Sequence, residues 1–229
     1  MQSLFEIAYK YRALLLSGAK TTLILSLVTT VLALIFGTIL SLMKIGRIHV
    51  LRWFANAYVE FIRGTPLLVQ IAIVFYGLPM IGINFPSVVI FGVDCERLVS
   101  GIFALTINSS AYVCEIVRSG IQSVDKGQME AARSIGFTRI ASMRLIVLPQ
   151  AMRNIMPAIG NEFVTLIKES SQVSVIGMAE LMYAADTIRG ISFKPFEPLI
   201  IVAVIYFLIT FPISSAIRLV EKSMRKSVG

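Results

Sequence analysis

The sequence predicts an all-α membrane protein in which about five helices cross the bilayer. Hydrophobic residues make up 56% of the 229 residues and charged residues only 15%, whereas soluble domains contain roughly 25% charged residues. Several apolar runs reach or approach the length of a membrane span. Basic residues lie beside these runs, as the surface of a membrane requires. We therefore treat residues 1–229 as a single membrane domain.

The first predicted span covers residues 21–42, between Lys20 and Lys44. A run of about 22 residues is enough to cross a hydrocarbon core of roughly 30 Å and too long for the apolar core of a signal peptide. Residues 1–19 mix apolar side chains with Lys10 and Arg12. This pattern predicts an amphipathic segment that lies on the membrane surface.

The second predicted span covers residues 57–78 and contains a break. The apolar run from Leu67 to Leu78 has only about 12 residues, so the span must extend back through Gly64-Thr65-Pro66. Such a break frees backbone polar groups, which is tolerated where the backbone is buried in protein or faces a water-filled cavity. Two interpretations stay open: a broken helix that lines a transport pathway, with Thr65 as a candidate residue, and an ordinary proline kink.

The third predicted span covers residues 98–117 and follows an external loop over residues 79–96. Asn108, Tyr112 and Glu115 are spaced i, i+4 and i+7, so they form one polar stripe on the helix. A carboxylate at the centre of a span costs roughly 2.5 to 3.5 kcal/mol and usually faces a bundle interior or a cavity. Glu115 is therefore a candidate for the transport pathway, and structural pairing with a neighbouring helix is the alternative.

Residues 125–149 form a polar, basic segment between two apolar regions, where a membrane protein presents a surface to the cytoplasm. Asp125 and Gln128 predict a capping box, so a helix is expected to begin near Lys126 and to end at Gly136 in a left-handed conformation. A helix of about ten residues is shorter than the roughly 12 to 15 residues at which an isolated helix is stable in water. Such a helix needs a partner, and we interpret residues 125–149 as a docking segment.

Four residues of the docking segment are candidate contacts. Ala131 and Ala132 are small enough to let another backbone approach closely, and the charge of Glu130 can set its orientation. Gly136 completes the set because it ends the helix. The alternative is a solvated connector between two membrane helices.

The fourth predicted span, residues 152–167, carries many polar side chains. Asn161 and Thr165 fall on one face of the helix, and Glu162 falls on the adjoining face. Polar groups in a segment that crosses lipid imply a polar or wet interior. This face is the best candidate for a translocation path. Hydrogen bonding between helices, at about 0.6 to 2 kcal/mol per contact, is the alternative.

The orientation follows from the basic residues. Residues 170–190 predict short helices at the external face, and the fifth span covers residues 199–219. Five spans place the link over residues 44–52, the link over residues 118–153 and the C-terminal tail on one side of the membrane. These segments contain about twice as many Lys and Arg residues as the external segments and the amino terminus together. The C-terminus and the docking segment are therefore predicted to be cytoplasmic. Lys10, Arg12 and Lys20 at the external amino terminus run against this rule.

Several other classes of protein find no support in the sequence. The net charge of the chain is +8. The basic residues lie beside apolar runs, so they indicate contact with a membrane surface rather than with nucleic acid. Cys95 and Cys114 lack metal-ligand spacing, and Cys114 lies inside an apolar run, so neither a metal site nor a disulfide is expected. His49 is the only histidine. The sequence contains no pair of a nucleophile and a base that would indicate an intramembrane enzyme.

Seven residues of the docking segment occur at the spacing of a known signature: Glu130, Ala131, Ala132, Gly136, Ile146, Leu148 and Pro149. They resemble the EAA motif of ABC-importer permeases, whose short cytoplasmic coupling helix seats in a cleft of an ATPase subunit. The similarity extends to four further stretches, residues 63–70, 111–118, 148–151 and 160–163. These are similar to the polar amino acid permeases of that superfamily, which serve histidine, arginine, lysine, glutamine and glutamate. The resemblance covers most of residues 21–219 and implies the type I ABC-importer transmembrane fold.

The resemblance also implies partners. In the family two five-span subunits pair, two ATPase subunits dock on their coupling helices, and an external binding protein delivers the amino acid. We expect two copies of this chain rather than two related chains, in a bacterial cytoplasmic membrane. Residues 168–172 read Lys-Glu-Ser-Ser-Gln where the group often has Lys-Asp-Thr-Ser-Leu. The amino acid therefore stays open, with basic amino acids and glutamine favoured.

The mechanism that this implies is alternating access driven by a separate ATPase. The chain has no G-x-x-x-x-G-K-[ST] phosphate loop, so ATP and Mg are expected on the partner, and this chain is expected to be non-catalytic, without cofactor or metal. An amino acid needs an acceptor for its ammonium group and donors for its carboxylate. The hypothesis assigns Glu115 and Glu162 to the ammonium group or to a cationic side chain. Thr65, Asn161 and Thr165 then offer neutral hydrogen bonds.

The alternative function is an ion- or proton-coupled secondary amino acid transporter that works without an ATPase. Its intramembrane carboxylates would carry protons. An odd number of spans and the lack of visible internal duplication argue against it.

Overall fold

The structure is a computed structural model that describes residues 2–86, 89–90 and 93–226. The described chain is helical apart from its connections and a small antiparallel hairpin of β1 (Val89–Ile90) and β2 (Val93–Asp94). The long elements are α2 (Arg12–Ile45), α3 (His49–Gly64), α6 (Cys95–Gln122), α9 (Leu148–Glu169) and α11 (Glu197–Lys226). The shorter helices are α1 (Gln2–Lys10), α4 (Leu67–Ala72), α5 (Leu78–Met80), α7 (Lys126–Ser134), α8 (Arg139–Ser142) and α10 (Leu181–Ser192). Three further turns are π-helical at Ile73–Gly77 and Met143–Val147 and 3-10 helical at Ser170–Ile176.

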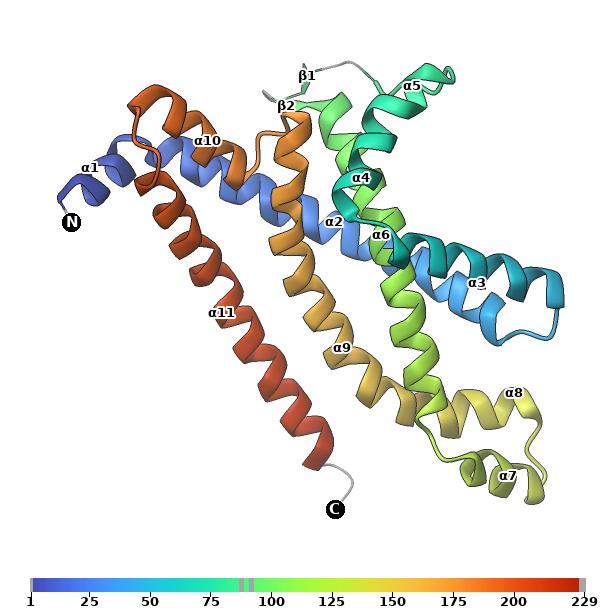
Figure 1. Ribbon diagram of the computed structural model, residues 1–229. Helices are drawn as coiled ribbons and strands as arrows, with labels where there is room; N and C mark the ends of the chain where they lie inside the picture. The colour runs from blue at the N-terminus through green and yellow to red at the C-terminus, as the bar shows by residue number, and fades with distance from the viewer. Residues whose placement is uncertain (1, 87–88, 91–92, 227–229) are drawn as a thin grey trace.

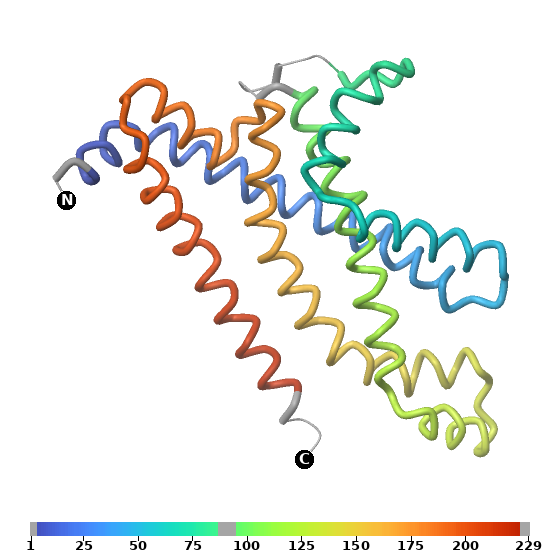
Figure 2. Tube along the Cα trace, viewed as in Figure 1, coloured from blue at the N-terminus to red at the C-terminus, as the bar shows by residue number. Residues whose placement is uncertain are grey.

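The helices form an elongated bundle with two distinct ends. In Figure 1, α7 and α8 lie at the same end of the molecule as the C-terminus, whereas α1, α10 and the hairpin lie at the opposite end. The trace in Figure 2 shows α2, in blue, passing across α9 and α6, which run between the two ends. The docking segment and the C-terminus therefore share one side, as the predicted topology requires.

The predicted spans correspond to helices that are longer than predicted. By length and composition α2, α6 and α11 are each able to cross a membrane. The pair formed by α3 and residues 67–80 qualifies only when its two parts are taken together. At 22 residues α9 is about 33 Å long, enough to cross. It is absent from the set of apolar helices because of its polar residues, which agrees with the polar character predicted for residues 152–167.

Small residues allow the central helices to pack closely. A Cβ atom added to Gly37 of α2 would lie 2.6 Å from the Cβ of Val113 and 2.8 Å from the backbone oxygen of Ser110, both on α6. A Cβ atom at Gly120 of α6 would clash in the same way with Ile155 of α9. Membrane helices associate through such close contacts because lipid provides little hydrophobic driving force between them. Glycine thus fixes α2, α6 and α9 against one another.

An apolar core joins the central helices to the turn after α9. Leu25, Ile71, Leu105, Leu166 and Val173 come from five different elements, and each is 0% exposed. Together they hold the second half of the broken helix against α2, α6 and α9. This packing fixes the position of the break relative to the polar residues of α6.

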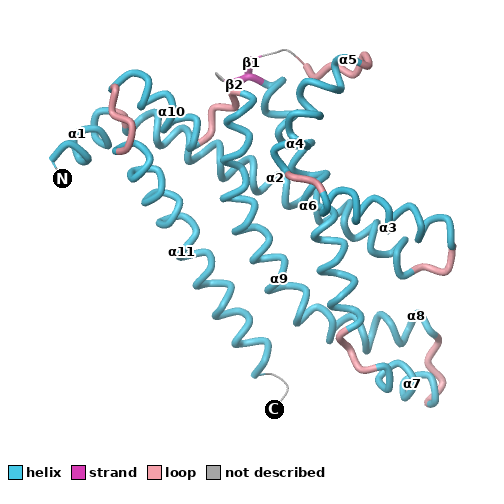
Figure 3. The backbone as a smooth tube through the Cα atoms, in the orientation of Figure 1, coloured by secondary structure: helices cyan, strands magenta, loops and turns pink. Residues whose placement is uncertain are grey.

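The predicted break at Gly64-Thr65-Pro66 is present and large. The helix axes before and after it differ by 106°, and Figure 3 shows the loop that separates α3 from α4. Pro66 has no backbone N–H and stands just before α4, where that donor would lack a helical partner. The prediction was wrong about the first part, because α3 begins at His49 rather than near residue 57. An ordinary proline kink does not describe a turn of this size.

The N-terminal segment differs from the surface helix predicted for residues 1–19. Residues 12–19 belong to α2, and α1 packs against the protein. Ile7 and Leu15 are buried in a cluster with Leu181, Ala185 and Ile201 of α10 and α11. An amphipathic pattern requires only an apolar partner for one face, and here α10 and α11 supply much of it.

Candidate functional site

A hydrogen-bond network closes the break between α3 and α4. The side-chain Nε2 of Gln70 lies 2.7 Å from the backbone oxygen of Ile62, and 3.1 Å and 2.8 Å from the backbone oxygen and Oγ1 of Thr65. The hydroxyl of Thr65 in turn donates to the backbone oxygen of Phe61 at 2.9 Å. Gln70 therefore satisfies acceptors that the broken helix leaves without backbone donors. Its own Oε1 accepts a hydrogen bond from Asn108 Nδ2 at 2.9 Å, which ties the break to α6.

Glu115 is held between two cations. Its Oε1 lies 2.5 Å from Lys44 Nζ at the end of α2, and its Oε2 accepts hydrogen bonds from Arg118 Nε at 2.9 Å and Nη2 at 2.6 Å. Only 18% of the Glu115 side chain is exposed. Both oxygens accept hydrogen bonds from cations, so in this conformation the charge of the carboxylate is already compensated without a substrate ammonium group. The geometry is that of the alternative, structural pairing with a neighbouring helix.

Glu162 has a much poorer set of partners. Its Oε1 accepts one hydrogen bond, from Ser109 Oγ on α6 at 2.7 Å. No ion pair involves Glu162 among the residues that the structure describes. The side chain is half-buried. The result is a carboxylate with one neutral donor and no compensating cation.

The other predicted pathway residues lie at different depths. Asn161 is exposed and Thr165 is half-buried, both on α9. Thr65 lies at the break and is engaged in the Gln70 network. The structure thus gathers Glu162, Asn161 and Thr165 on α9 and places Thr65 and Glu115 in two separate bonded clusters.

The docking segment contains the predicted helix with a different cap. Helix α7 begins at Lys126, and the Asp125 side chain accepts a hydrogen bond from the Gly127 backbone N–H at 2.7 Å. Gly136 has a φ of 95°, the left-handed conformation predicted for it. The reciprocal half of the capping box is absent, because Gln128 Oε1 accepts from Gln150 of α9 at 3.2 Å instead. Gln128 therefore joins α7 to the start of α9.

The two alanines of the docking segment have different surroundings. Ala132 is only 5% exposed and so contacts its own chain. Ala131 and Glu130 are exposed. Beside them Ile135 is 77% exposed and Ile140 is 80% exposed. An apolar surface of this kind on a polar segment indicates a protein contact.

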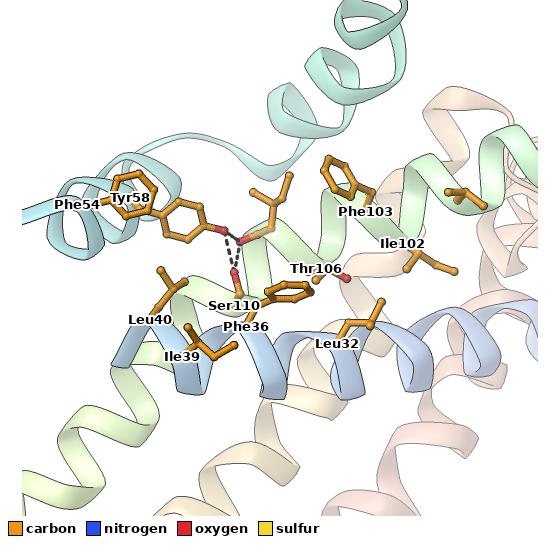
Figure 4. Close-up of a pocket in the computed structure, with 12 residues that line it drawn as sticks. Leu32, Phe36, Ile39, Leu40, Phe54, Tyr58, Ile102, Phe103, Thr106 and Ser110 are labelled. Atoms are coloured by element: carbon orange, nitrogen blue, oxygen red, sulfur yellow. Dashed lines mark hydrogen bonds between the residues drawn. The ribbon is translucent and has the colours of Figure 1, made fainter. Parts of the chain in front are cut away.

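An apolar groove lies between α2, α3 and α6, away from these polar clusters. Its volume is about 440 Å³. Figure 4 shows the Tyr58 hydroxyl directed at Ser110 and at the backbone of Ile107, with 2.8 Å to each oxygen. Its remaining labelled side chains are largely apolar, among them Phe36, Phe54 and Phe103. The groove carries no charged residue in its lining, so it does not fit the binding of a polar solute.

No group of three His, Cys, Asp or Glu side chains gathers as a metal site would require within the described residues. Neither Cys95 nor Cys114 forms a disulfide among the described residues.

Comparison with known proteins identifies the family. Residues 30–226 match the family of the binding-protein-dependent transport system inner membrane component. The chain belongs to this family. It is thus a permease component of a transport system, with several apolar helices that make it a multi-pass membrane protein. The permease family is a family of membrane channel subunits, which agrees with a non-catalytic role.

Individual relatives cover nearly the whole permease. It is 38% identical over 212 residues to the probable glutamine ABC transporter permease protein GlnM of Bacillus subtilis, which covers 93% of this chain and 94% of the relative. It is also 38% identical to the arginine transport system permease protein ArtQ of Bacillus subtilis, with 93% of both chains covered.

Solved structures confirm the fold. A structure described as an amino acid ABC transporter with histidines has a TM-score of 0.86 and 45% identity and covers 94% of this chain and 96% of its own. The MetNI methionine ABC transporter in inward-facing conformations has a TM-score of 0.68 at 20% identity, covering 91% of this chain and 97% of its own, so it supports the fold alone. The predicted type I ABC-importer fold and the predicted permease family are confirmed. None of the relatives named here is a secondary transporter, which leaves that alternative without support.

Sequence reasoning missed three residues that organise the permease. Gln70 stands alone in an otherwise apolar run, and its position four residues after Pro66 is the signal that could have identified it as the cap of the break. Lys44 was noted only as a flank of the first span, yet it neutralises Glu115 from 71 residues away. Ser109 of the third span is the partner of Glu162, and the sequence analysis did not single it out.

Proposed function

We propose that this permease is the membrane subunit of an ATP-driven importer for polar amino acids, with glutamine and basic amino acids as the favoured substrates. The names of its relatives support this, since they are given as glutamine and arginine permeases. The solved structure at 45% identity is described as an amino acid transporter with histidines. All three amino acids carry an α-ammonium group, an α-carboxylate and a polar or cationic side chain.

The observation that carries the proposal is the isolated carboxylate of Glu162. An ammonium or guanidinium group is the natural partner for a half-buried carboxylate whose single hydrogen bond comes from a neutral hydroxyl, Ser109. Asn161 and Thr165 lie on the same helix and offer neutral donors for the substrate carboxylate. Glu115 is assigned a structural role in this conformation, since Lys44 and Arg118 already occupy it.

The docking segment supports a coupling role. Glu130 and Ala131 are exposed, next to the exposed Ile135 and Ile140, so they form a surface that an ATPase subunit can cover. Gly136 ends α7 and lies between the exposed Ile135 and Ile140 of this surface. We propose that two ATPase subunits dock here on the cytoplasmic side of a bacterial cell membrane, where the C-terminus also lies. ATP and Mg are bound by those subunits, and this chain binds no cofactor.

The remaining partners follow from the same proposal. A second permease subunit, in our proposal a second copy of this chain, completes the pathway, and an external binding protein delivers the amino acid. ATP binding closes the ATPase pair and moves α7 of each subunit, which shifts the polar face of α9 between the two sides of the membrane.

The substrate role is tested with Glu162→Gln. The transporter is assembled in proteoliposomes with its ATPase and binding protein, and ATP-driven uptake of radiolabelled arginine, glutamine and histidine is measured. A charge-assisted hydrogen bond contributes about 1.5 to 3 kcal/mol, so uptake of the preferred substrate should fall roughly 10- to 100-fold. Glu60→Gln, at an exposed carboxylate on α3, is the matched control and should leave uptake unchanged. Equal uptake by the Glu162→Gln variant would remove this residue from the pathway.

The coupling role is tested separately with Ala131→Arg. This variant adds a long charged side chain to the exposed face of α7 and should prevent co-purification of the ATPase. Ala13→Arg makes the same substitution at an exposed alanine at the opposite end of the molecule and should leave the complex intact. Retention of the ATPase by the Ala131→Arg variant would contradict docking at this surface.

A further inference from the structure

A second apolar groove lies at the end of the molecule opposite the docking segment. It has a volume of about 480 Å³ and opens between α1, the first turns of α2 and the first turns of α11. Nine of its lining residues are apolar and one is charged: Leu4, Phe5, Ala8, Arg12, Leu15, Leu16, Ile200, Ile201, Val204 and Ile205. The groove described between α2, α3 and α6 has a similar volume, about 440 Å³, and no charged residue. Only the second groove therefore has a charged residue, Arg12, in its lining.

Two helices that are each able to cross a membrane begin beside this groove, so we assign it to the boundary between hydrocarbon and headgroups. Arg12 is the first residue of α2, and Ile200 lies in the first turn of α11, so the groove begins where two apolar helices begin. Beside it Phe5 is 77% exposed and Tyr9 is 71% exposed. Tyrosine is enriched at the membrane interface, where its ring and its hydroxyl both find suitable surroundings. A ligand in this groove would have its apolar part within the bilayer and its polar part at the surface.

Arg12 is held with its guanidinium group at the groove. Its Nη1 donates a hydrogen bond to the backbone oxygen of Tyr9 at 2.8 Å, and its guanidinium carbon lies 4.3 Å from the centroid of the Tyr9 ring. These contacts use one of the five N–H donors of the group and leave the side chain exposed. A planar guanidinium group with free donors matches a phosphate.

The acidic residues nearby do not neutralise this site. Glu6 lines a different cavity, with Lys10 and Lys194. Glu197 forms an ion pair with Lys194 at 3.4 Å. Arg12 has no ion-pair partner within the described residues. With Lys10 and Lys20 close in sequence, this end of the chain carries an excess of positive charge.

We propose that this groove binds an anionic phospholipid of the leaflet opposite to the docking segment. One acyl chain lies in the groove against Leu15, Ile201 and Ile205, and the phosphate is bound by Arg12. A second copy of this chain is a poorer occupant, because symmetric pairing at this surface would bring Arg12 towards Arg12 without an acidic partner. The binding site gives a role to Arg12, one of the basic residues at the amino terminus that run against the charge rule for external segments.

Native mass spectrometry of the full chain in detergent tests the proposal. Phosphatidylglycerol is titrated against the protein, with phosphatidylcholine of the same acyl chains as the neutral comparison. We expect one phosphatidylglycerol molecule to be retained and its affinity to fall about 5-fold or more in Arg12→Gln. Lys20→Gln removes an equal charge from an exposed position of α2 outside the groove lining, and it should change the affinity less than 2-fold.

A second variant tests the apolar part of the site. Ala8→Phe fills the groove and should displace the lipid, while Leu32→Phe places a phenyl ring in the uncharged groove and should not. Equal losses in Arg12→Gln and Lys20→Gln, or equal retention of phosphatidylcholine, would overturn the proposal in favour of unspecific attraction. A dimer that dissociates in Arg12→Gln and Ala8→Phe would overturn it in favour of a second copy of the chain.

Discussion

Glu115 on α6 and Glu162 on α9 are both half-buried carboxylates in predicted membrane spans, but their surroundings are opposite. Lys44 and Arg118 engage both oxygens of Glu115. Glu162 accepts a single hydrogen bond from a serine. A carboxylate inside a membrane protein can therefore belong to an ion pair that holds helices together, or it can remain a negative charge without a compensating cation. The neighbouring cations, rather than the position in a span, decide which of the two it is.

The largest effect on the free energy of unfolding is expected from a third carboxylate, Glu180. Unlike Glu115 and Glu162, this carboxylate is fully buried. It is 0% exposed and caps α10 through the backbone N–H groups of Met182 and Tyr183, and Tyr206 of α11 donates to it at 2.9 Å. No cation pairs with it among the described residues. Burial raises the pKa of Glu180 from 4.5 to about 7.

The pKa of Glu180 makes the stability dependent on pH. Between about pH 4.5 and pH 7 the unfolded chain has lost this proton and the folded chain still holds it. The free energy of unfolding should therefore fall as pH rises through this window, by roughly 3 kcal/mol in all, and level off above it. Thermal unfolding in detergent at several pH values measures this. Glu180→Gln should flatten the dependence, and an unchanged slope in that variant would assign it to other groups.

The next largest effect is expected at Glu115. Glu115→Gln leaves Lys44 and Arg118 without their carboxylate, and the loss of a partly buried ion pair should lower the free energy of unfolding by about 2 kcal/mol. Thermal unfolding in detergent provides the measurement, and Lys44→Met combined with Glu115→Leu should recover part of the loss. If uptake is lost while unfolding is unchanged, Glu115 belongs with Glu162 in the pathway and the contrast between them fails.

A smaller effect is expected at the break between α3 and α4. The neutral amide of Gln70 makes the hydrogen bonds there, whereas charged side chains hold Glu115. Gln70→Leu removes the donors for the backbone oxygens of Ile62 and Thr65 and should lower the free energy of unfolding by about 1 to 2 kcal/mol. Gln172→Leu makes the same change at a glutamine that has no side-chain hydrogen bond among the described residues, and it is the control. A Gln70→Leu variant as stable as the parent would mean that water replaces the amide at the break.

The smallest expected effect sharpens the comparison most directly. Glu162→Gln should change the free energy of unfolding by no more than about 0.5 kcal/mol, because no ion pair is broken. The same variant should lose uptake, as described above. Thermal unfolding and uptake measured on one preparation separate a role in transport from a role in folding. A large loss of stability would place Glu162 in the same structural class as Glu115.

Much of the fold was predictable because its causes are local. The break at Gly64-Thr65-Pro66 follows from the chemistry of proline. Helix α7 begins at Lys126 and ends before Gly136 because its start and stop signals lie directly next to the helix in the sequence. The polar face of α9 was predictable from the spacing of its residues. Local chemistry and periodicity were sufficient for these features.

The partners of the site residues could not be predicted in the same way. Lys44 reaches Glu115 across 71 residues, and Ser109 reaches Glu162 across 53, so neither contact leaves a trace in local spacing. Ala131 and Ala132 are adjacent and identical, yet only the packing of α7 against its own chain determines that Ala132 is buried. The amino terminus was assigned to the membrane surface because an amphipathic pattern does not reveal that α10 and α11 cover its apolar face.

The sharp turn at Thr65 has one more consequence, which concerns electric fields. The carbonyl end of α3 and the amide end of α4 meet there, and helix ends carry partial charges of about −0.5 and +0.5. The turn thus presents both signs of partial charge within a few residues and contains no group that gains or loses a proton. Its field is the same in acid and in base, whereas the field of an uncompensated carboxylate such as Glu162 disappears when it is protonated.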